Sequence, residues 1–422
     1  MALDYSATAR GGFSMVPRFF SRDAQIRVLM YSHDTFGLGH LRRTRAIAHA
    51  LVERHKQLSV LIISGSSIAG AFDFKSRVDF VKVPSVIKLR NGEYTSLSNH
   101  IDIADTLGMR RAIIETAAVQ FAPDVFIVDK EPRGLKGELD TTLPQLARQG
   151  CSIVLGLREV LDAPATVRRE WSASGAMECV RDYYERIWVY GSKDFHDPLE
   201  GVDLPEPVRE RIDHVGFLAR TVPKIMNPMR RKLPDDFVLV TAGGGGDGAD
   251  MMRYVLSALK HDRNLRQPYV LVLGPFMSIR EKSEIRHKAS RLENVVVLDF
   301  DTQLEALMQK ARAVVAMGGY NTFCELLSFD CRALIVPRKT PRVEQLIRAK
   351  RASEFGLCSM IDPDEASDPR RMAKALFDLT DRARPSATPY RVDLKGLDRI
   401  SATVASIAKS RRRIPANLRV HA

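Results

Sequence analysis

The chain has 422 residues, of which 45% are hydrophobic, and a formal net charge of +13. This length exceeds the size at which a single hydrophobic core usually stops growing, so we expect two domains. Five scattered cysteines without a Cys-x-x-Cys pair argue against a disulfide framework and against a structural zinc site. No apolar run is long enough for a signal peptide or a membrane span, and we therefore expect a cytoplasmic protein.

The basic charge suits an anionic partner, such as nucleic acid, anionic lipid or a phosphorylated small molecule. We expect no nucleic-acid partner, because the sequence has no signature of an RNA-recognition, zinc-finger or KH module. The stretch from Lys409 to Arg419 is basic and contains no acidic residue. It is interpreted either as a solvated tail or as a peripheral contact with an anionic membrane at its inner face.

In the first half, short apolar runs alternate with stretches of helical spacing. The predicted strands are 26–32, 58–66, 80–86, 123–132, 151–159, 186–191 and 212–218, and the first predicted helix is 42–54. Such alternation is typical of βαβ units in a mostly parallel sheet.

The pattern restarts after the stretch 221–236, which carries three prolines and no clear periodicity. The second set of predicted strands is 237–246, 269–275, 294–300, 313–319 and 332–338. We expect an N-terminal extension (1–23), an N-terminal Rossmann-like domain (24–220), a linker (221–234), a C-terminal Rossmann-like domain (235–385), and a C-terminal helix with a basic tail (386–422). The fold class is α/β, and both domains can place ligands at their strand ends, facing a shared cleft.

A first glycine turn lies between strand 26–32 and the helix that follows. Gly37 and Gly39 remove side chains that would keep a ligand from the backbone, and the helix start offers a site for an anion. His40 is suited to donating to a phosphate or to acid–base chemistry near neutral pH. The alternative is a tight turn in which His40 only caps the helix.

A second turn, TAGGGGDGAD, contains Gly244, Gly245 and Gly246 between a strand and a helix. Neither turn has the spacing of a Walker ATPase or of a dinucleotide-binding fingerprint. A third turn contains Gly318 and Gly319, followed by Thr322 and Glu325. These residues are interpreted either as a site for a diphosphate and ribose or as a capping box. Glu344 and Gln345, after the next strand, suit sugar hydroxyls.

These turns and acidic residues resemble GT-B glycosyltransferases of the family 28 type, which include the enzyme that makes lipid II. The resemblance is closest over 26–51 and 237–355. It implies a C-terminal domain that binds a UDP-sugar and an N-terminal domain that takes the acceptor. The residues that it assigns to the donor are Gly244, Gly245 and Gly246 with Thr322 (diphosphate side), Phe300 and Asp301 (uracil), Glu325 (ribose), Glu344 and Gln345 (sugar), and Gly37, Gly39 and His40 (the N-terminal loop facing the diphosphate).

The N-terminal loop GLGHLRR is also similar to that of a nucleotide-sugar hydrolase of pseudaminic-acid synthesis, which shares the fold and uses its histidine to activate water. Asp299-x-Asp301 could be mistaken for a metal-binding motif, but its place at a strand end favours a structural role. We expect neither a metal nor another cofactor.

The expected activity is metal-independent transfer of a sugar from a nucleotide-sugar to a hydroxyl of a glycan or lipid-linked acceptor, in bacterial cell-surface or exopolysaccharide synthesis. His40 is the first candidate for the base, and Asp129 or Glu131 is the second, with pairing to Lys130, Arg133 or solvent as the alternative for these two carboxylates. Hydrolysis of the nucleotide-sugar and binding without catalysis remain open.

Overall fold

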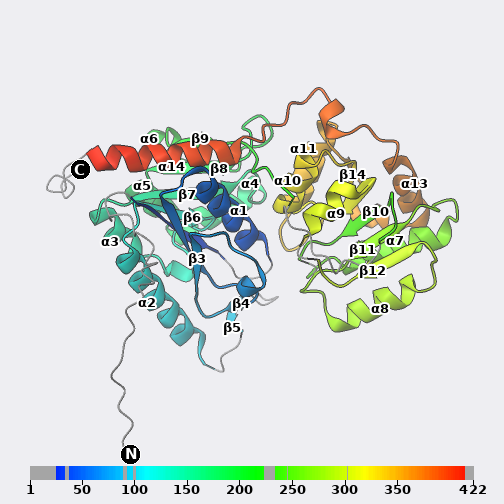
Figure 1. Cartoon of the computed structure of the whole chain (residues 1–422), viewed down its shortest axis with the longest axis horizontal. Coiled ribbons are helices and arrows are strands. Elements are labelled where there is room, and N and C mark those ends of the chain that lie inside the picture. The colour runs from blue at the N-terminus through cyan, green and yellow to red at the C-terminus, as the bar shows by residue number, and fades with distance from the viewer. Residues whose placement is uncertain are drawn as a thin grey trace, which may run out of the picture.

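The computed structural model describes residues 25–33, 38–88, 93–97, 101–222, 233–244, 246–301 and 303–413. These residues form two lobes, each built on a parallel β-sheet with helices packed against it (Figure 1). The prediction of an α/β protein with two Rossmann-like domains is therefore confirmed.

The N-terminal domain contains a seven-stranded sheet in the order β3-β2-β1-β6-β7-β8-β9, with all neighbours parallel. Its strands are β1 (Ile26–Ser32), β2 (Leu58–Ser64), β3 (Val78–Lys82), β6 (Val125–Asp129), β7 (Ser152–Arg158), β8 (Arg186–Tyr190) and β9 (Ile212–His214). Its helices are α1 (Gly39–Arg54), α2 (Ile103–Phe121), α3 (Thr142–Arg148), α4 (Pro164–Ser174), α5 (Ala176–Tyr183) and α6 (Glu206–Arg209), with short 3₁₀ turns η2 (Ala69–Ala71) and η3 (Leu135–Gly137).

The strands are apolar throughout because both faces of this sheet are covered. On β1, Val28 and Met30 belong to one buried cluster, which also contains residues of α1. Leu29 and Tyr31 point to the opposite face, into a second cluster that includes Ile114 of α2. This two-sided burial explains why the sequence shows continuous apolar runs instead of alternation.

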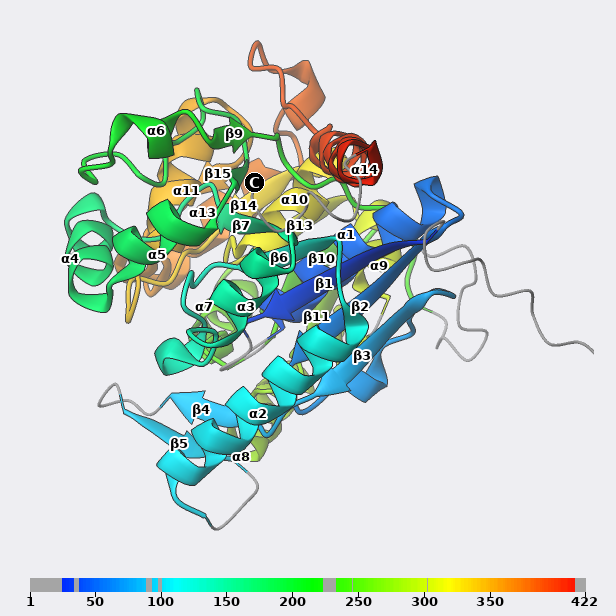
Figure 2. The ribbon, with the colours of Figure 1, turned by 90° about the vertical axis from the view of Figure 1, so that its left-hand side faces the viewer.

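The prediction of one strand over 80–86 is wrong. The parallel strand β3 ends at Lys82, and a separate antiparallel hairpin of β4 (Val86–Lys88) and β5 (Tyr94–Ser96) follows. Pro84 lies between them and has no backbone N–H to donate to a continuing ladder. The hairpin and α2 lie together at one end of the domain (Figure 2).

The C-terminal domain contains a six-stranded parallel sheet in the order β12-β11-β10-β13-β14-β15. Its strands are β10 (Val238–Thr241), β11 (Tyr269–Val272), β12 (Val295–Leu298), β13 (Ala313–Ala316), β14 (Ala333–Ile335) and β15 (Ser359–Met360). Its helices are α7 (Ala249–His261), α8 (Ile279–Ala289), α9 (Leu304–Lys310), α10 (Tyr320–Ser328), α11 (Glu344–Glu354), α12 (Pro363–Ala366) and α13 (Pro369–Leu379), followed by the short turn η4 (Pro385–Ala387). The strands β10 to β14 correspond to the five predicted ones, and β15 was not expected.

The last helix, α14 (Gly396–Arg413), leaves the C-terminal domain and packs on the N-terminal one (Figure 1). Ile400 and Val404 of this helix are fully buried in the cluster that contains Ile47 of α1. The ring atom Nε2 of His55 lies 3.2 Å from the carbonyl oxygen of Ser401. The chain therefore passes between the two domains twice. Both connections restrain the position of one domain relative to the other.

The two domains also share a buried aromatic contact next to these crossings. Phe195 of the N-terminal domain packs against Phe323 of α10, with ring centroids 5.6 Å apart, and against Phe355. Beside them Arg348 of α11 pairs with Glu159, and neither side chain is exposed at all. Because a buried charge is stable only with its partner in place, this ion pair favours one arrangement of the two domains.

All five cysteines are buried free thiols. Among the helices of the described ranges, none is both long and apolar enough to cross a membrane.

Candidate active site

His40 lies in the first turn of α1, which begins at Gly39 and not at the predicted residue 42. Gly39 has no positive φ, and a Cβ at this position would meet nothing within 4 Å. The backbone conformation therefore does not require a glycine at this position, and the lack of a side chain leaves open space beside it. Gly37, the other glycine of this turn, lies outside the described residues.

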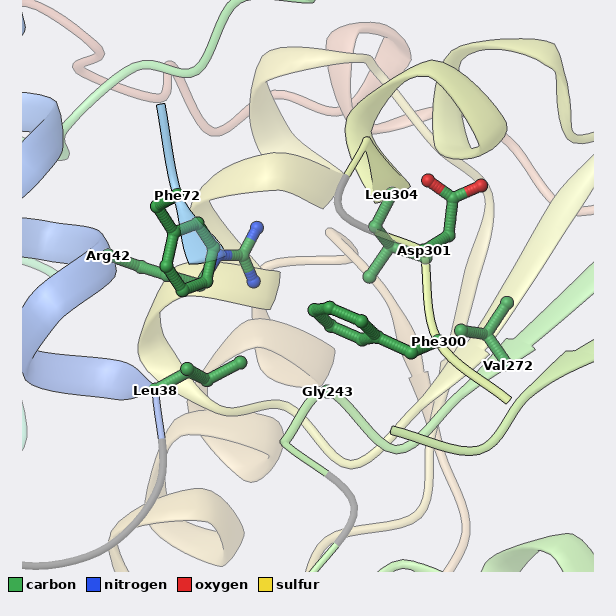
Figure 3. Close-up of a pocket in the computed structure, with 8 residues that line it drawn as sticks. All are labelled: Leu38, Arg42, Phe72, Gly243, Val272, Phe300, Asp301 and Leu304. Atoms are coloured by element: carbon green, nitrogen blue, oxygen red, sulfur yellow. The ribbon is translucent and has the colours of Figure 1, made fainter. Parts of the chain in front are cut away.

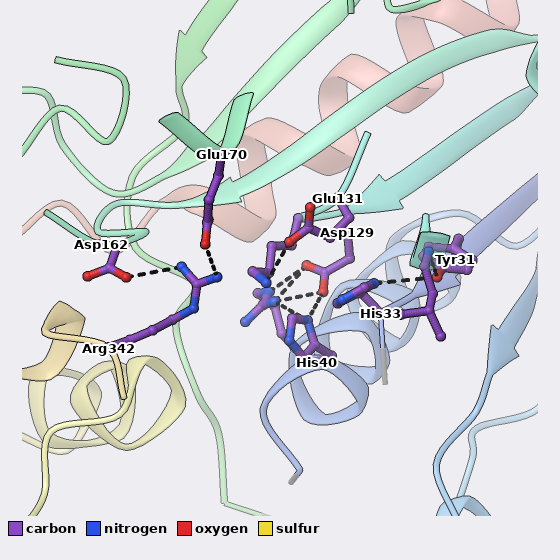
Figure 4. Close-up of polar contacts among 11 residues, drawn as sticks. Tyr31, His33, His40, Asp129, Glu131, Asp162, Glu170 and Arg342 are labelled. Atoms are coloured by element: carbon purple, nitrogen blue, oxygen red, sulfur yellow. Dashed lines mark hydrogen bonds and ion pairs between the residues drawn. The ribbon is translucent and has the colours of Figure 1, made fainter. Parts of the chain in front are cut away.

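His40 is held by Asp129, the last residue of β6, so two candidates for the base are in direct contact (Figure 4). The ring atom Nδ1 of His40 forms a short hydrogen bond with Oδ2 of Asp129. Asp129 also accepts from Arg43, whose Nε and Nη2 lie 2.8 and 2.7 Å from Oδ1 and whose Nη2 lies 2.7 Å from Oδ2. Arg43 and His40 hold the pKa of Asp129 well below its ordinary value, so Asp129 is ionised and can only accept. The proton of its bond with His40 is therefore on Nδ1, although Nη2 of Arg43 also lies 3.1 Å from that atom.

Burial and charge place these groups in defined protonation states. Burial lowers the pKa of His40 to about 4, against the opposing effect of Asp129. Burial alone would raise the pKa of Asp129, but Arg43 and His40 hold it well below its ordinary value. At neutral pH the site therefore contains a neutral imidazole next to a carboxylate and a guanidinium.

Glu131 does not join this cluster. Lys130 has a φ of +71°, which ends the strand, so Asp129 and Glu131 do not share a face of it. Glu131 pairs with Lys130 at 2.7 Å, and in the described part of the chain no hydrogen bond or ion pair joins it to His40. The alternative interpretation, a pair with Lys130, is confirmed for Glu131 and is wrong for Asp129.

His33, at the end of β1, is a further member of the cluster that was not predicted. Its ring contacts that of His40 edge to face, with centroids 5.5 Å apart, and it lies 3.4 Å from the hydroxyl of Tyr31. Burial and the nearby charge of Lys130 lower its pKa well below the ordinary value. Its position at a strand end that faces the cleft was the signal that could have identified it.

The glycine turns of the C-terminal domain lie at the ends of β10 and β13. Gly243 has a φ of +62°, and a Cβ on it would lie 3.7 Å from Oγ1 of Thr322, which places the two turns next to each other. Gly318 has a φ of +79°, and a Cβ there would meet Ile335 at 2.8 Å, so only glycine fits. Gly319 is the N-cap of α10, with open space beside it. Gly244 and Gly246 belong to the same turn as Gly243, whereas Gly245 lies outside the described residues.

Two helices begin at these turns without a side-chain cap. They are α10, after Gly319, and α7, after Gly248. The first N–H groups of a helix have no partner within the helix, and the positive end of the helix dipole lies there. Both helix starts can therefore receive an anionic group.

Glu325 is not part of a capping box, because α10 is capped by Gly319 without any side-chain bond. Its side chain is completely buried, and its Oε1 accepts from Nη2 of Arg42, which comes from α1 of the other domain. Arg42 also donates to Glu305 at 2.8 Å. The second oxygen of Glu325, Oε2, is buried and has no hydrogen-bond partner. Burial raises the pKa of Glu325 to about 7 despite the charge of Arg42.

A pocket lies between the domains next to Arg42 (Figure 3). Residues of both domains line it: Leu38, Arg42 and Phe72 from the N-terminal domain, and Gly243, Val272, Phe300, Asp301 and Leu304 from the C-terminal domain. The structure therefore brings Phe300 and Asp301 together with the first glycine of the β10 turn, and Arg42 reaches into the same space.

Glu344 and Gln345 begin α11 and are both buried. Arg338 holds them: its backbone N–H donates to Oε1 of Gln345 at 3.2 Å, and its side chain pairs with Oε1 of Glu344. Burial would raise the pKa of Glu344, but Arg158, Arg338 and Arg348 lower it. Its Oε2 is buried without a partner, as in Glu325.

Arg42 and Arg43 were not predicted, although they follow His40 directly. On a helix, residues three positions apart lie on one side, so Arg43 shares a face with His40. Arg42 points to the other domain instead. In the described part of the chain no group of three or more His, Cys, Asp or Glu side chains is arranged to hold a metal ion.

Comparison with known proteins agrees with this geometry. Residues 237–397 match the model of the glycosyltransferase family 28 C-terminal domain. No curated protein matches the chain.

Solved structures with a similar fold include several glycosyltransferases. A UDP-glucosyltransferase from Polygonum tinctorium has a TM-score of 0.57 at 12% identity, covering 92% of this chain and 94% of that one. The glycotransferase of kitacinnamycin has a TM-score of 0.56 at 16% identity, covering 92% and 95%. MurG of Acinetobacter baumannii has a TM-score of 0.50 at 11% identity, covering 90% and 99%. The fold is thus GT-B, and residues 237–397 are similar to the C-terminal domain of family 28 glycosyltransferases.

Proposed function

We propose that this GT-B glycosyltransferase transfers a sugar from a UDP-sugar to a hydroxyl group of a glycan or lipid-linked acceptor, with His40 as the general base and without a metal ion. The observation that carries the proposal is the contact between His40 and Asp129. His40 is a neutral imidazole on the N-terminal domain, and this domain faces the glycine turns of the C-terminal one. Those turns lie within the residues that match the family 28 model.

The proposed base is the ring atom Nε2 of His40. Because Nδ1 is engaged with Asp129, Nε2 keeps its lone pair and can accept a proton. The acceptor oxygen attacks the anomeric carbon, its proton passes to Nε2, and the bond from that carbon to the diphosphate breaks. The ionised Asp129 then stabilises the imidazolium that forms, in the way that a carboxylate supports a catalytic histidine.

The leaving diphosphate takes the bonding electron pair and needs positive charge beside it. The uncapped N-termini of α7 and α10, which begin at the two glycine turns, support this role. Gly243, Gly244 and Gly319 would allow the diphosphate to approach the backbone, and Thr322 lies next to Gly243.

The rest of the donor is assigned from the buried polar atoms of the C-terminal domain. We assign Glu325 to the ribose hydroxyls and Glu344 with Gln345 to the sugar. Each of the two carboxylates has one oxygen without a partner, which a ligand hydroxyl can satisfy. Phe300 and Asp301 line the pocket, and we assign them to the uracil of the donor. A ribose that places both hydroxyls on Glu325 would use the free Oε2 and would displace Arg42 from Oε1.

Hydrolysis of the donor is the second candidate, because the same imidazole could activate water as readily as a sugar hydroxyl. Synthesis of a bacterial surface glycan or exopolysaccharide, on an acceptor at the inner face of the membrane, is the setting that we propose for the transferase.

The deciding experiment is incubation of the full-length protein with a panel of UDP-sugars in the presence of EDTA, with and without candidate acceptors, while UDP release is followed. Release that depends on the acceptor supports the transferase. Release without any acceptor supports the hydrolase. Binding of a UDP-sugar without release would contradict both activities and identify a nucleotide-sugar binding protein.

A further inference from the structure

Arg43 is buried between the two domains beside the proposed base. Its side chain is 2% exposed, and its Nε and Nη2 donate hydrogen bonds to Asp129. Its guanidinium lies over the ring of Tyr320, 5.6 Å from the ring centroid. Tyr320 is the first residue of α10, so Arg43 connects the base to the helix that carries Glu325. No role for Arg43 follows from donor binding or from the transfer step as described above.

We propose that Arg43 is a positioning residue that neutralises Asp129 and thereby keeps His40 uncharged and fixed in the tautomer that leaves Nε2 free. The inference rests on the proposed function of His40 as a base. It identifies a three-residue unit, His40–Asp129–Arg43, in place of a histidine–carboxylate pair.

The argument starts from charge balance in a buried site. Asp129 is 4% exposed, and a buried carboxylate requires a cation next to it. Two groups within hydrogen-bonding distance can supply that charge, Arg43 and a protonated His40. With Arg43 in place the charge of Asp129 is already balanced. A second proton on His40 is then not favoured, and the imidazole stays neutral.

Without Arg43 the buried carboxylate would draw a proton onto His40 instead. An imidazolium has no free lone pair, so it cannot act as a base until the pH rises above its pKa. The same guanidinium fixes the carboxylate geometrically, because it donates to both oxygens of Asp129 and leaves Oδ2 aimed at Nδ1 of His40.

The other charged groups around His40 do not replace Arg43. Lys130, at the end of β6, faces His40 and is paired with Glu131. His33 contacts the ring of His40 and is itself held neutral by burial and Lys130. Tyr190 and Tyr320 face Arg43, and both keep their protons because burial raises their pKa. Arg158, at the end of β7, adds a further positive charge on the side of Arg43.

The test is NMR of the full-length protein with isotopically labelled histidine, which reports both the pKa and the tautomer of His40. The His40 signal is assigned by its absence in His40→Gln. We expect that Arg43→Met raises the pKa of His40 by at least about one unit. Arg43→Lys keeps the charge but replaces the planar guanidinium fork by a single ammonium group. We expect this variant to leave the pKa of His40 near that of the unmodified protein and to weaken the preference of His40 for one tautomer. Arg45→Met is the matched control, since Arg45 lies on the same helix and donates to the carbonyl oxygen of Asp73.

A folded Arg43→Met variant in which His40 keeps its pKa would overturn the proposal. If that variant does not fold, Arg43→Gln takes its place, because a glutamine removes the charge but can still donate a hydrogen bond to Asp129. The pKa of His40 should rise in Arg43→Gln as well, and an unchanged pKa in a folded Arg43→Gln would overturn the proposal.

The kinetic arm separates this inference from the proposed function. In Arg43→Met the acidic limb of kcat/KM should move to higher pH together with the NMR pKa of His40. If the NMR pKa moves and the kinetic limb does not, the charge balance is supported and the assignment of His40 as the base is wrong.

Discussion

The carboxylates on the two sides of the proposed active site differ in how completely their oxygens are paired. On the N-terminal side, both oxygens of Asp129 are occupied, by Arg43 and His40. On the C-terminal side, Glu325 and Glu344 each keep one buried oxygen without a partner. A buried polar atom without a partner costs free energy, and a ligand that hydrogen-bonds to it recovers that cost.

This difference fits the different roles proposed for the two sides, a general base on one side and donor binding on the other. A general base has to be fixed before the substrate arrives, since its effect depends on geometry and on its charge state. A binding site gains affinity only if its polar groups are left for the ligand. Asp129 is therefore fully paired in the free protein, whereas Glu325 pairs with Arg42 through one oxygen and leaves the other for a ligand.

The largest expected effect comes from removing the base. His40→Ala should lower turnover by about 10²–10⁴-fold, the usual contribution of a positioned acid or base. UDP affinity, measured by calorimetry, should change little because the C-terminal domain is proposed to hold the nucleotide. His261→Ala, on the exposed end of α7, is the control. Full turnover with a lower melting temperature would mean that His40 has only a structural role.

The next effect concerns the donor side. Glu325→Ala should weaken binding of UDP about tenfold or more, since a charge-assisted contact to ribose contributes about 1.5–3 kcal/mol. Glu305→Ala is the matched variant, because Glu305 also binds Arg42 but is not assigned to the ribose. Equal affinities of Glu325→Ala and the unmodified protein would remove Glu325 from the donor site.

The protonation of Glu325 should be visible in the stability of the free protein. Its folded pKa of about 7 lies above the ordinary 4.5, so the folded protein binds this proton more tightly than the unfolded chain. The resulting stabilisation is complete below about pH 4.5 and is lost as the pH rises through 7, by about 1–3 kcal/mol. The unfolding free energy should therefore fall less between pH 5 and pH 8 in Glu325→Gln than in the unmodified protein. Parallel curves for the two proteins would contradict the shifted pKa.

The smallest effect should have the opposite sign. Arg42→Met should tighten UDP binding by about three- to tenfold, because the nucleotide no longer has to displace Arg42 from Glu325. Arg45→Met, on the same helix, should leave the affinity unchanged. Weaker binding in Arg42→Met would mean that Arg42 contacts the nucleotide directly and that the two sides of the site are less different than they look in the free protein.

Much of the fold was predictable because its signals are local. Strands buried on both faces appear as short apolar runs, which identified β1, β7 and the five strands from β10 to β14. The glycine turn after β13 was predictable for a similar reason: the backbone at Gly318 tolerates no side chain. The strand 80–86 failed because Pro84 divides an apolar run into two elements with different partners.

The site depended on contacts between residues far apart in the chain. The sequence alone ranked His40 first and Asp129 or Glu131 second as candidates for the base, but it did not show which of them are in contact. The contact of His40 with Asp129 comes from the packing of α1 against the end of β6, and the same packing pairs Asp129 with Arg43, 86 positions away. Arg42 meets Glu325 across 283 positions and across the two domains. Local pattern determines which residues can form a strand, a turn or a helix, whereas the partner of a buried charge depends on which elements the tertiary fold brings together.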